Sequence, residues 1–92
     1  MKKETISIIA IELLKSDDWN EINMGMFGML DNIYKQCVKR KVIKDHKHHP
    51  LYRQAYIMAQ LRKSRLFKNV GHIDYSGFGR AYSNCAVMEI IN

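Results

Sequence analysis

The chain has 92 residues, of which 15 are Lys or Arg and 9 are Asp or Glu, and its formal net charge is +6. This length predicts a single domain over residues 1–92 and excludes an enzyme with separate cofactor and substrate domains. The hydrophobic fraction of 47% excludes a disordered basic tail. The longest apolar run, residues 8–14, contains Glu12 and is too short to span a bilayer, so we expect a cytoplasmic protein without membrane contact.

The first third of the chain predicts one helix and the start of a second. Ile6, Ile9 and Leu13 recur at helical spacing and predict a helix over about residues 3–15. Asp18, followed three residues later by Glu21, fits an acidic capping box at a helix start. Apolar residues then recur every three or four positions, which predicts a second helix over residues 18–43.

Two glycines interrupt the apolar pattern of this second helix. Each of Gly25 and Gly28 costs about 1 kcal/mol relative to alanine in a helix interior, so each needs a structural reason. A tight helix crossing in the core is the favoured interpretation, and a flexible Met-rich contact surface is the alternative. The sequence leaves open whether the helix is continuous through both glycines.

The second half of the chain predicts a third helix and a short final element. Pro50 is suited to the first position of a helix, which we predict over residues 50–67, paired with the second helix as a hairpin. Residues 78–88 keep helical spacing and favour a short terminal helix, although residues 86–91 would also fit a strand. We therefore predict an all-α fold: a small bundle of three main helices plus a short C-terminal helix or strand.

The charge is distributed unevenly along the chain. Residues 1–32 carry three Lys against six acids, a net −3, whereas residues 33–68 carry eleven Lys and Arg against Asp45 alone, a net +10. Such a basic segment is typical of a surface for a polyanion or an acidic protein, and a charged face that only maintains solubility is the alternative. Tyr52 and Tyr56 are candidates for stacking on bases. The candidate polyanion-binding residues, called the basic belt below, are Lys39, Arg40, Lys41, Lys44, Lys47, Arg53, Arg62, Lys63, Arg65 and Lys68.

The sequence contains no strong catalytic, cofactor or metal motif. His46, His48 and His49 form only one cluster, whereas zinc signatures pair two, so we expect no metal ion. Cys37 and Cys85 fall on apolar stripes and are expected to be small core residues with free thiols. The glycines and arginine of residues 77–80 follow no nucleotide-binding pattern. We expect neither a cofactor nor an enzymatic activity.

These observations favour a small non-catalytic basic protein that binds nucleic acid or a nucleic-acid-handling complex. The alternative is an accessory protein of the phage or mobile-element type, which inhibits or adapts a host protein by direct binding. A weaker alternative is a homo-oligomer that holds a small anionic ligand between its subunits. The candidate residues for a protein-partner surface are Met24, Met26, Phe27, Met29, Phe78 and Arg80.

Overall fold

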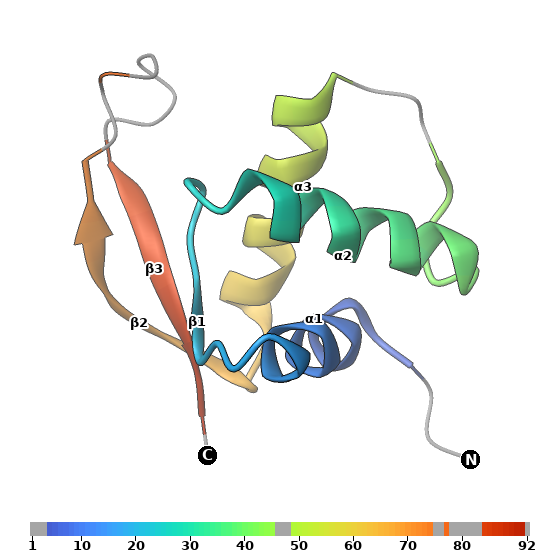
Figure 1. The fold of residues 1–92 in the computed structure, drawn as a ribbon, viewed down its shortest axis with the longest axis horizontal. Helices are drawn as coiled ribbons and strands as arrows, with labels where there is room; N and C mark the ends of the chain where they lie inside the picture. Colours follow the sequence, from blue (N-terminus) through green and yellow to red (C-terminus); the bar gives the residue numbers. More distant parts are fainter. Residues whose placement is uncertain (1–3, 46–48, 75–76, 78–83, 92) are drawn as a thin grey trace.

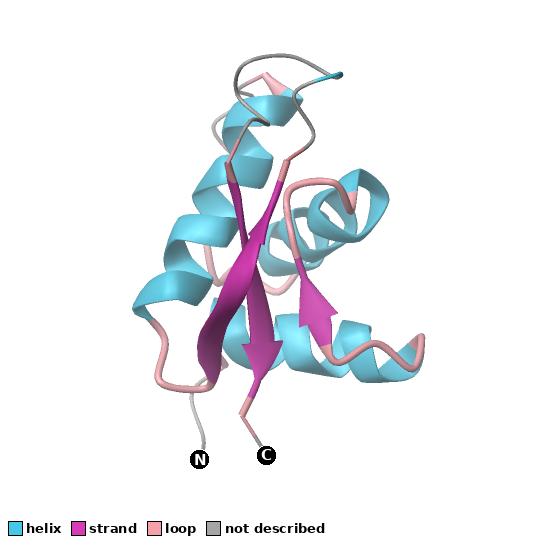
Figure 2. Cartoon of the chain, turned by 90° about the vertical axis from the view of Figure 1, so that its left-hand side faces the viewer, coloured by secondary structure: helices cyan, strands magenta, loops and turns pink. Residues whose placement is uncertain are grey.

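The computed structural model describes residues 4–45, 49–74, 77 and 84–91 and contains helices on one side of a sheet (Figure 1). The strands form one antiparallel sheet in the order β1-β3-β2, and Figure 2 shows the helices behind one face of it. The fold is therefore α+β, and the all-α prediction is wrong. In chain order the elements are α1 (Ile6–Ser16), β1 (Glu21–Ile22), α2 (Phe27–Lys39), α3 (Pro50–Lys63), β2 (Phe67–Ile73) and β3 (Cys85–Ile90).

One hydrophobic core joins all six elements. It combines the apolar stripes of the helices with the helix-facing residues of the sheet, as burial of apolar surface requires. Its members include Ile9 and Leu14 of α1, Ile22 of β1, Leu30, Ile33 and Cys37 of α2, Ile57 and Leu61 of α3, Phe67 of β2, and Met88 and Ile90 of β3.

Helix α1 ends in a left-handed turn at Asp18, which has a φ of 60°. The Trp19 N–H donates to the Leu14 carbonyl at 2.9 Å, and the Asp18 N–H donates to the Lys15 carbonyl at 3.1 Å. This pair of bonds is the Schellman motif that satisfies the last carbonyls of a helix. Asp18 therefore closes the first helix and does not open the second, so the predicted capping box is wrong.

The chain then forms strand β1 and a turn, where the sequence predicts helix. The side chain of Asn23 accepts a hydrogen bond from the Gly25 N–H at 2.8 Å, and its carbonyl accepts one from the Met26 N–H at 3.0 Å. This Asx turn directs the chain into α2, so the predicted helix over residues 18–43 does not run through Gly25. Gly28 lies in the first turn of α2 with no atom within 4 Å of an added Cβ, so a tight crossing there is also wrong.

Helix α2 ends in a second Schellman motif, four residues before the predicted end at Ile43. Lys41 has a φ of 60°, and its N–H donates to the Val38 carbonyl at 3.0 Å. The Val42 N–H donates to the Cys37 carbonyl at 2.8 Å. The turn directs the chain away from the helix axis, and in Figure 1 α2 crosses α3 and does not run beside it as a hairpin.

Helix α3 begins at Pro50, as predicted, but ends at Lys63 and not near Phe67. The side chain of His49 caps this helix, because its Nδ1 accepts from the Leu51 N–H at 3.1 Å. The chain then continues into β2, which the sequence did not predict. An irregular register between Asn69 and Gly71 interrupts the alternation of β2, and Gly71 has a φ of 153° that suits glycine.

The terminal segment contains a strand where helical spacing favours a helix. Cys85–Ile90 forms β3, which pairs with β1 on one side and β2 on the other. Val87 and Met88 are adjacent and both buried, so this central strand lacks the alternating pattern by which a strand is recognised. The favoured terminal helix is therefore wrong for residues 85–90, while residues 78–83 lie outside the described part of the chain.

Replacing Lys41 by glycine should stabilise the fold, because glycine adopts a φ of 60° without the steric cost of a side chain. We expect the free energy of unfolding, measured with urea, to rise by about 0.5–1 kcal/mol. The matched control is Lys39→Gly, which removes the same charge from the regular last turn of α2 and should lower that free energy by about 0.5–1 kcal/mol. A loss of stability in both variants would contradict the assignment of Lys41 to a left-handed turn.

Candidate nucleic-acid interface

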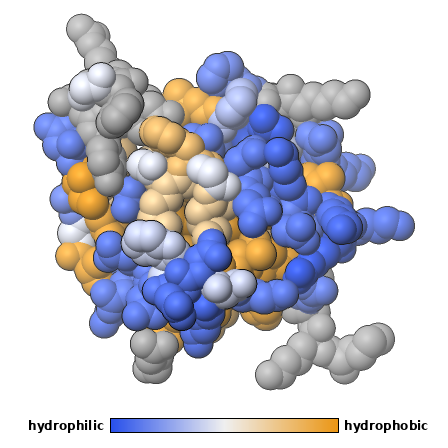
Figure 3. All heavy atoms as spheres, in the orientation of Figure 1, coloured by the Kyte–Doolittle hydropathy of each residue, from blue (hydrophilic) through white to orange (hydrophobic). Residues whose placement is uncertain are grey.

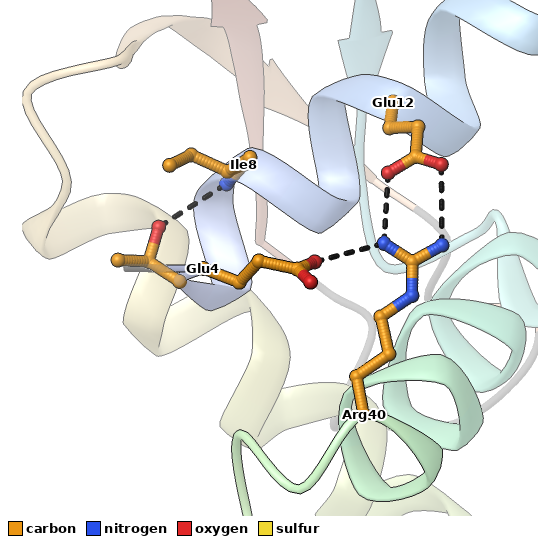
Figure 4. Close-up of polar contacts among 5 residues, drawn as sticks. Glu4, Ile8, Glu12 and Arg40 are labelled. Atoms are coloured by element: carbon orange, nitrogen blue, oxygen red, sulfur yellow. Dashed lines mark hydrogen bonds and ion pairs between the residues drawn. The ribbon is translucent and has the colours of Figure 1, made fainter. Parts of the chain in front are cut away.

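Three members of the basic belt have acidic partners within the fold, and Arg40 is the clearest case. Its guanidinium binds both carboxylate oxygens of Glu12, at 2.8 and 3.1 Å, and the Glu4 carboxylate at 2.9 Å (Figure 4). These hydrogen bonds lower the pKa of Glu12 and raise the pKa of Arg40. Arg40 therefore connects the end of α2 to α1 and is not available as a phosphate ligand.

Arg53 and Lys68 also interact within the protein. The guanidinium carbon of Arg53 lies 5.4 Å from the centre of the Tyr34 ring, and one of its nitrogens is 4.0 Å from Asp31. Lys68 of β2 lies opposite Glu89 of β3, with 3.6 Å between the amine and the carboxylate. We therefore remove Arg40, Arg53 and Lys68 from the set of candidate ligands.

The remaining described cations do not form one continuous surface. Arg62 lines a groove of about 320 Å³ between α3 and the sheet, beside His72 and Ala86. Lys63, the next residue, lines a different hollow between α3 and the start of α1. Lys47 lies outside the described residues. Within the described part, the belt residues that are exposed and have no acidic partner are Lys39, Lys41, Lys44, Arg62, Lys63 and Arg65.

Two adjoining hollows bring three of these lysines to one region, here called the basic groove. The first hollow, of about 450 Å³, lies between the start of α1 and the C-terminal half of α3. The second, of about 530 Å³, lies along the loop after α2 and shares Val42 and Ile43 with the first. Together they are lined by residues Glu4–Ser7, Val38, Lys41–Asp45, Tyr56, Gln60, Lys63 and Ser64.

The side chains that line the basic groove suit an anionic ligand that also has hydrogen-bonding groups. Lys41, Lys44 and Lys63 contribute positive charge, and the two acids of the lining already have partners. Glu4 binds Arg40, and Asp45 accepts a hydrogen bond from the Tyr34 hydroxyl at 3.4 Å. Neutral donors in the same lining come from Thr5, Ser7, Gln60 and Ser64.

The predicted stacking residues lie on the same face of α3. Tyr56 is partly buried and lines the basic groove. Tyr52 precedes it by four residues, one helical turn, and its side chain is 56% exposed. The structure thus brings Tyr56 together with part of the predicted basic belt, whereas Tyr52 lines neither hollow of the groove.

The predicted Met-rich surface is present in part and includes residues the sequence did not single out. Met24 is buried in the core, but Met26, Phe27 and Met29 line an open hollow of about 440 Å³ with Trp19. Its other lining residues are Asp17, Gly25, Gly28 and Asn32, and it is called the Trp19 hollow below. Figure 3 shows apolar side chains gathered over the start of α2. Phe78 and Arg80 lie outside the described residues.

The two cysteines are buried, and burial disfavours the thiolate form of both side chains. Burial raises the pKa of the Cys37 thiol to about 11, and burial also raises the pKa of Cys85. Among the described residues, no group of three or more His, Cys, Asp or Glu side chains is placed to hold a metal ion. His46 and His48 lie outside those residues, and His49 caps α3.

Sequence reasoning missed several residues of both surfaces. Val42 and Ile43 were assigned to the end of a helix, although two β-branched residues between Lys41 and Lys44 are unusual in a basic run. Trp19 was assigned to a helix start, although the only tryptophan of the chain stands between acidic and amide side chains. Nothing in the sequence distinguishes Gln60 and Ser64, because they line the groove only when α1 packs against α3.

A comparison of the chain with protein-family models, curated proteins and solved structures finds no match. In the part of the chain that the structure describes, no helix is long and apolar enough to cross a membrane.

Replacing Glu12 by glutamine should lower stability in a pH-dependent way. The ion pair with Arg40 lowers the pKa of Glu12 below its ordinary value of 4.5, so its stabilisation is present above that pH and is lost as the pH falls through the folded-state pKa. We expect the difference in unfolding free energy between wild type and Glu12→Gln to be positive at pH 7 and to shrink below about pH 4.5. Urea unfolding at several pH values measures it.

The control for this experiment is the same substitution in an Arg40→Gln background. Without the guanidinium, Glu12→Gln should change stability by a similar amount at every pH. A difference that stays constant from pH 7 to pH 3 in the presence of Arg40 would contradict the ion pair.

Proposed function

We propose that this chain is a non-catalytic binding protein that holds the backbone of a nucleic acid in the basic groove. The observation that carries the proposal is the meeting of Lys41, Lys44 and Lys63 around two adjoining hollows, in whose lining the charge of Glu4 is neutralised by Arg40. A phosphate backbone is the regularly spaced polyanion that such a groove fits, because each lysine neutralises one phosphate and releases counterions.

The surroundings of the lysines support this proposal. The hydroxyl and amide side chains of Thr5, Gln60 and Ser64 are of the kinds that contact phosphate and sugar oxygens. The Schellman turn at Lys41 and the ion pair of Arg40 fix the loop that carries two of the three lysines. The groove is thus held by the fold, and its cations extend into solvent on flexible stems.

A second candidate function is inhibition or adaptation of another protein through the Trp19 hollow. The specific observation is the exposure of two aromatic side chains at one hollow: Trp19 is 47% exposed and Phe27 is 37% exposed. Tryptophan, phenylalanine and methionine are enriched in the central parts of protein interfaces. Gly25 and Gly28 leave the start of α2 without side chains that would fill the hollow.

Reversing two charges of the basic groove should abolish most nucleic-acid binding. We compare Lys44→Glu/Lys63→Glu with Lys15→Glu/Lys35→Glu, which makes the same change in net charge outside the lining of the groove. Fluorescence anisotropy with labelled DNA and RNA at low salt should show at least about tenfold weaker binding for the first pair. On single strands, the slope of log affinity against log salt should fall by about 1.4, since each lost phosphate contact contributes about 0.7.

The control pair should bind within about threefold of the wild type, because outside the groove it alters the long-range field and the exposed ion pair of Lys35 with Asp31. Equal losses in both pairs would show an effect of net charge alone and overturn the assignment to the groove. Absence of any binding at low salt would overturn the proposed function.

Substitution of Gly28 tests the second candidate function without damaging the fold. Because the space around Gly28 is open, Gly28→Ala should raise the unfolding free energy by about 0.5 kcal/mol or more. Gly28→Trp should fill the Trp19 hollow and prevent capture of a protein from nuclease-treated host lysate, while Gly28→Ala should retain capture. Equal capture by the wild type and Gly28→Trp would exclude the hollow as the docking site.

A further inference from the structure

One stripe of α3 combines aromatic, amide and cationic side chains. Tyr52, Tyr56, Gln60 and Lys63 are separated by four, four and three residues, so they share one face of the helix. Tyr56, Gln60 and Lys63 line the basic groove, and Tyr52 extends the stripe by one turn toward the start of α3. From Tyr52 to Lys63 the stripe is about 16 Å long, from the helical rise per residue.

We propose that the basic groove binds single-stranded nucleic acid, with an unpaired base stacked on Tyr52 and the backbone continuing past Tyr56 to Lys63. The proposal rests on the proposed function and specifies its ligand. Tyr52 is 56% exposed and lies one helical turn before Tyr56, at the end of the stripe nearest the start of α3. A base stacked there contributes affinity with any of the bases, since each base has an aromatic face.

A duplex fits this stripe less well than a single strand. In a duplex the bases are stacked on one another and only their edges are accessible in the grooves, so no base except those of the two end pairs can stack on a tyrosine. The stripe is long enough for about five stacked nucleotides of one strand at about 3.4 Å each. Lysines border the groove on the α3 side, through Lys63, and on the loop side, through Lys41 and Lys44, so a backbone that lies in the groove has cations on both sides.

The test measures binding of a 12-nucleotide single strand and of the same sequence as a 12-base-pair duplex by fluorescence anisotropy at low salt. We expect the single strand to bind at least about tenfold more tightly than the duplex, because any base of the single strand can stack, whereas the duplex offers only its two end pairs. DNA and RNA versions form separate arms, since the backbone and base chemistry of the groove is common to both. Tighter binding of the DNA strand or of the RNA strand identifies which of the two nucleic acids is the ligand.

The Tyr52→Ala variant distinguishes the contribution of base stacking to the affinity from the contribution of the lysine charges. Alanine is a good helix former and Tyr52 is exposed, so α3 should remain folded, as circular dichroism will verify. We expect about tenfold weaker binding of the single strand, with duplex binding unchanged, and full binding by Tyr52→Phe. On an abasic strand, which retains its phosphates, the wild type and Tyr52→Ala should bind equally.

The matched control is Trp19→Leu, which removes an exposed aromatic ring outside the groove and should bind the single strand as the wild type does. Equal binding of single strand and duplex, or no effect of Tyr52→Ala on the single strand, overturns this inference while the proposed function stands. Loss of all binding in the wild type, or binding insensitive to Lys44→Glu/Lys63→Glu, overturns the proposed function itself.

Discussion

The position of the basic groove depends on how helix α2 ends. At Arg40 the side chain turns toward α1 and binds Glu4 and Glu12, and at Lys41 the backbone enters the left-handed region. Together these features direct the chain so that Val42 and Ile43 pack against the core and line the groove. An exposed ion pair contributes little stability by itself, but a guanidinium bound by two carboxylates fixes geometry as well as charge.

The same ion pairs reduce the number of cations in the +10 segment, residues 33–68, that are available to a ligand. The acidic first third of the chain folds partly against it, through Glu4 and Glu12 on Arg40 and through Asp31 near Arg53. Glu89 of the last strand lies beside Lys68 in the same way. The cations that remain exposed are separated by α3, with Arg62 on the sheet side and Lys63 on the α1 side. Of the belt residues that keep exposed cations in the described part of the chain, Lys41, Lys44 and Lys63 line the basic groove, whereas Lys39, Arg62 and Arg65 lie outside its lining.

The two candidate surfaces lie at opposite ends of α1. The basic groove includes the residues at its start, and the Trp19 hollow includes Asp17 and Trp19 directly after its end. A helix of 11 residues separates its two ends by about 16 Å. A nucleic acid in the groove and a protein at the hollow would therefore contact different side chains, and the variants proposed for one surface do not alter the lining of the other.

Local periodicity and single residues are enough to predict part of the fold from the sequence. Helical spacing identifies α1 and α3, Pro50 marks the start of α3, and the apolar stripes place Cys37 in the core. The sequence also identifies the basic segment and the pair of tyrosines. These properties depend only on residues that are close in sequence, so they can be predicted without the tertiary structure.

The sheet, the ends of α2 and the subset of cations that form a site depend on contacts between distant parts of the chain. Strand β3 needs β1 and β2 as partners, and burial on both faces removes its alternating pattern. Asp18 and Lys41 adopt a conformation usually taken by glycine, and in both turns backbone N–H groups donate to the last carbonyls of the preceding helix. Which cations have an acidic partner depends on acids up to 36 residues away, as Arg40 and Glu4 show. Contacts between residues so distant in sequence form only when the chain has folded.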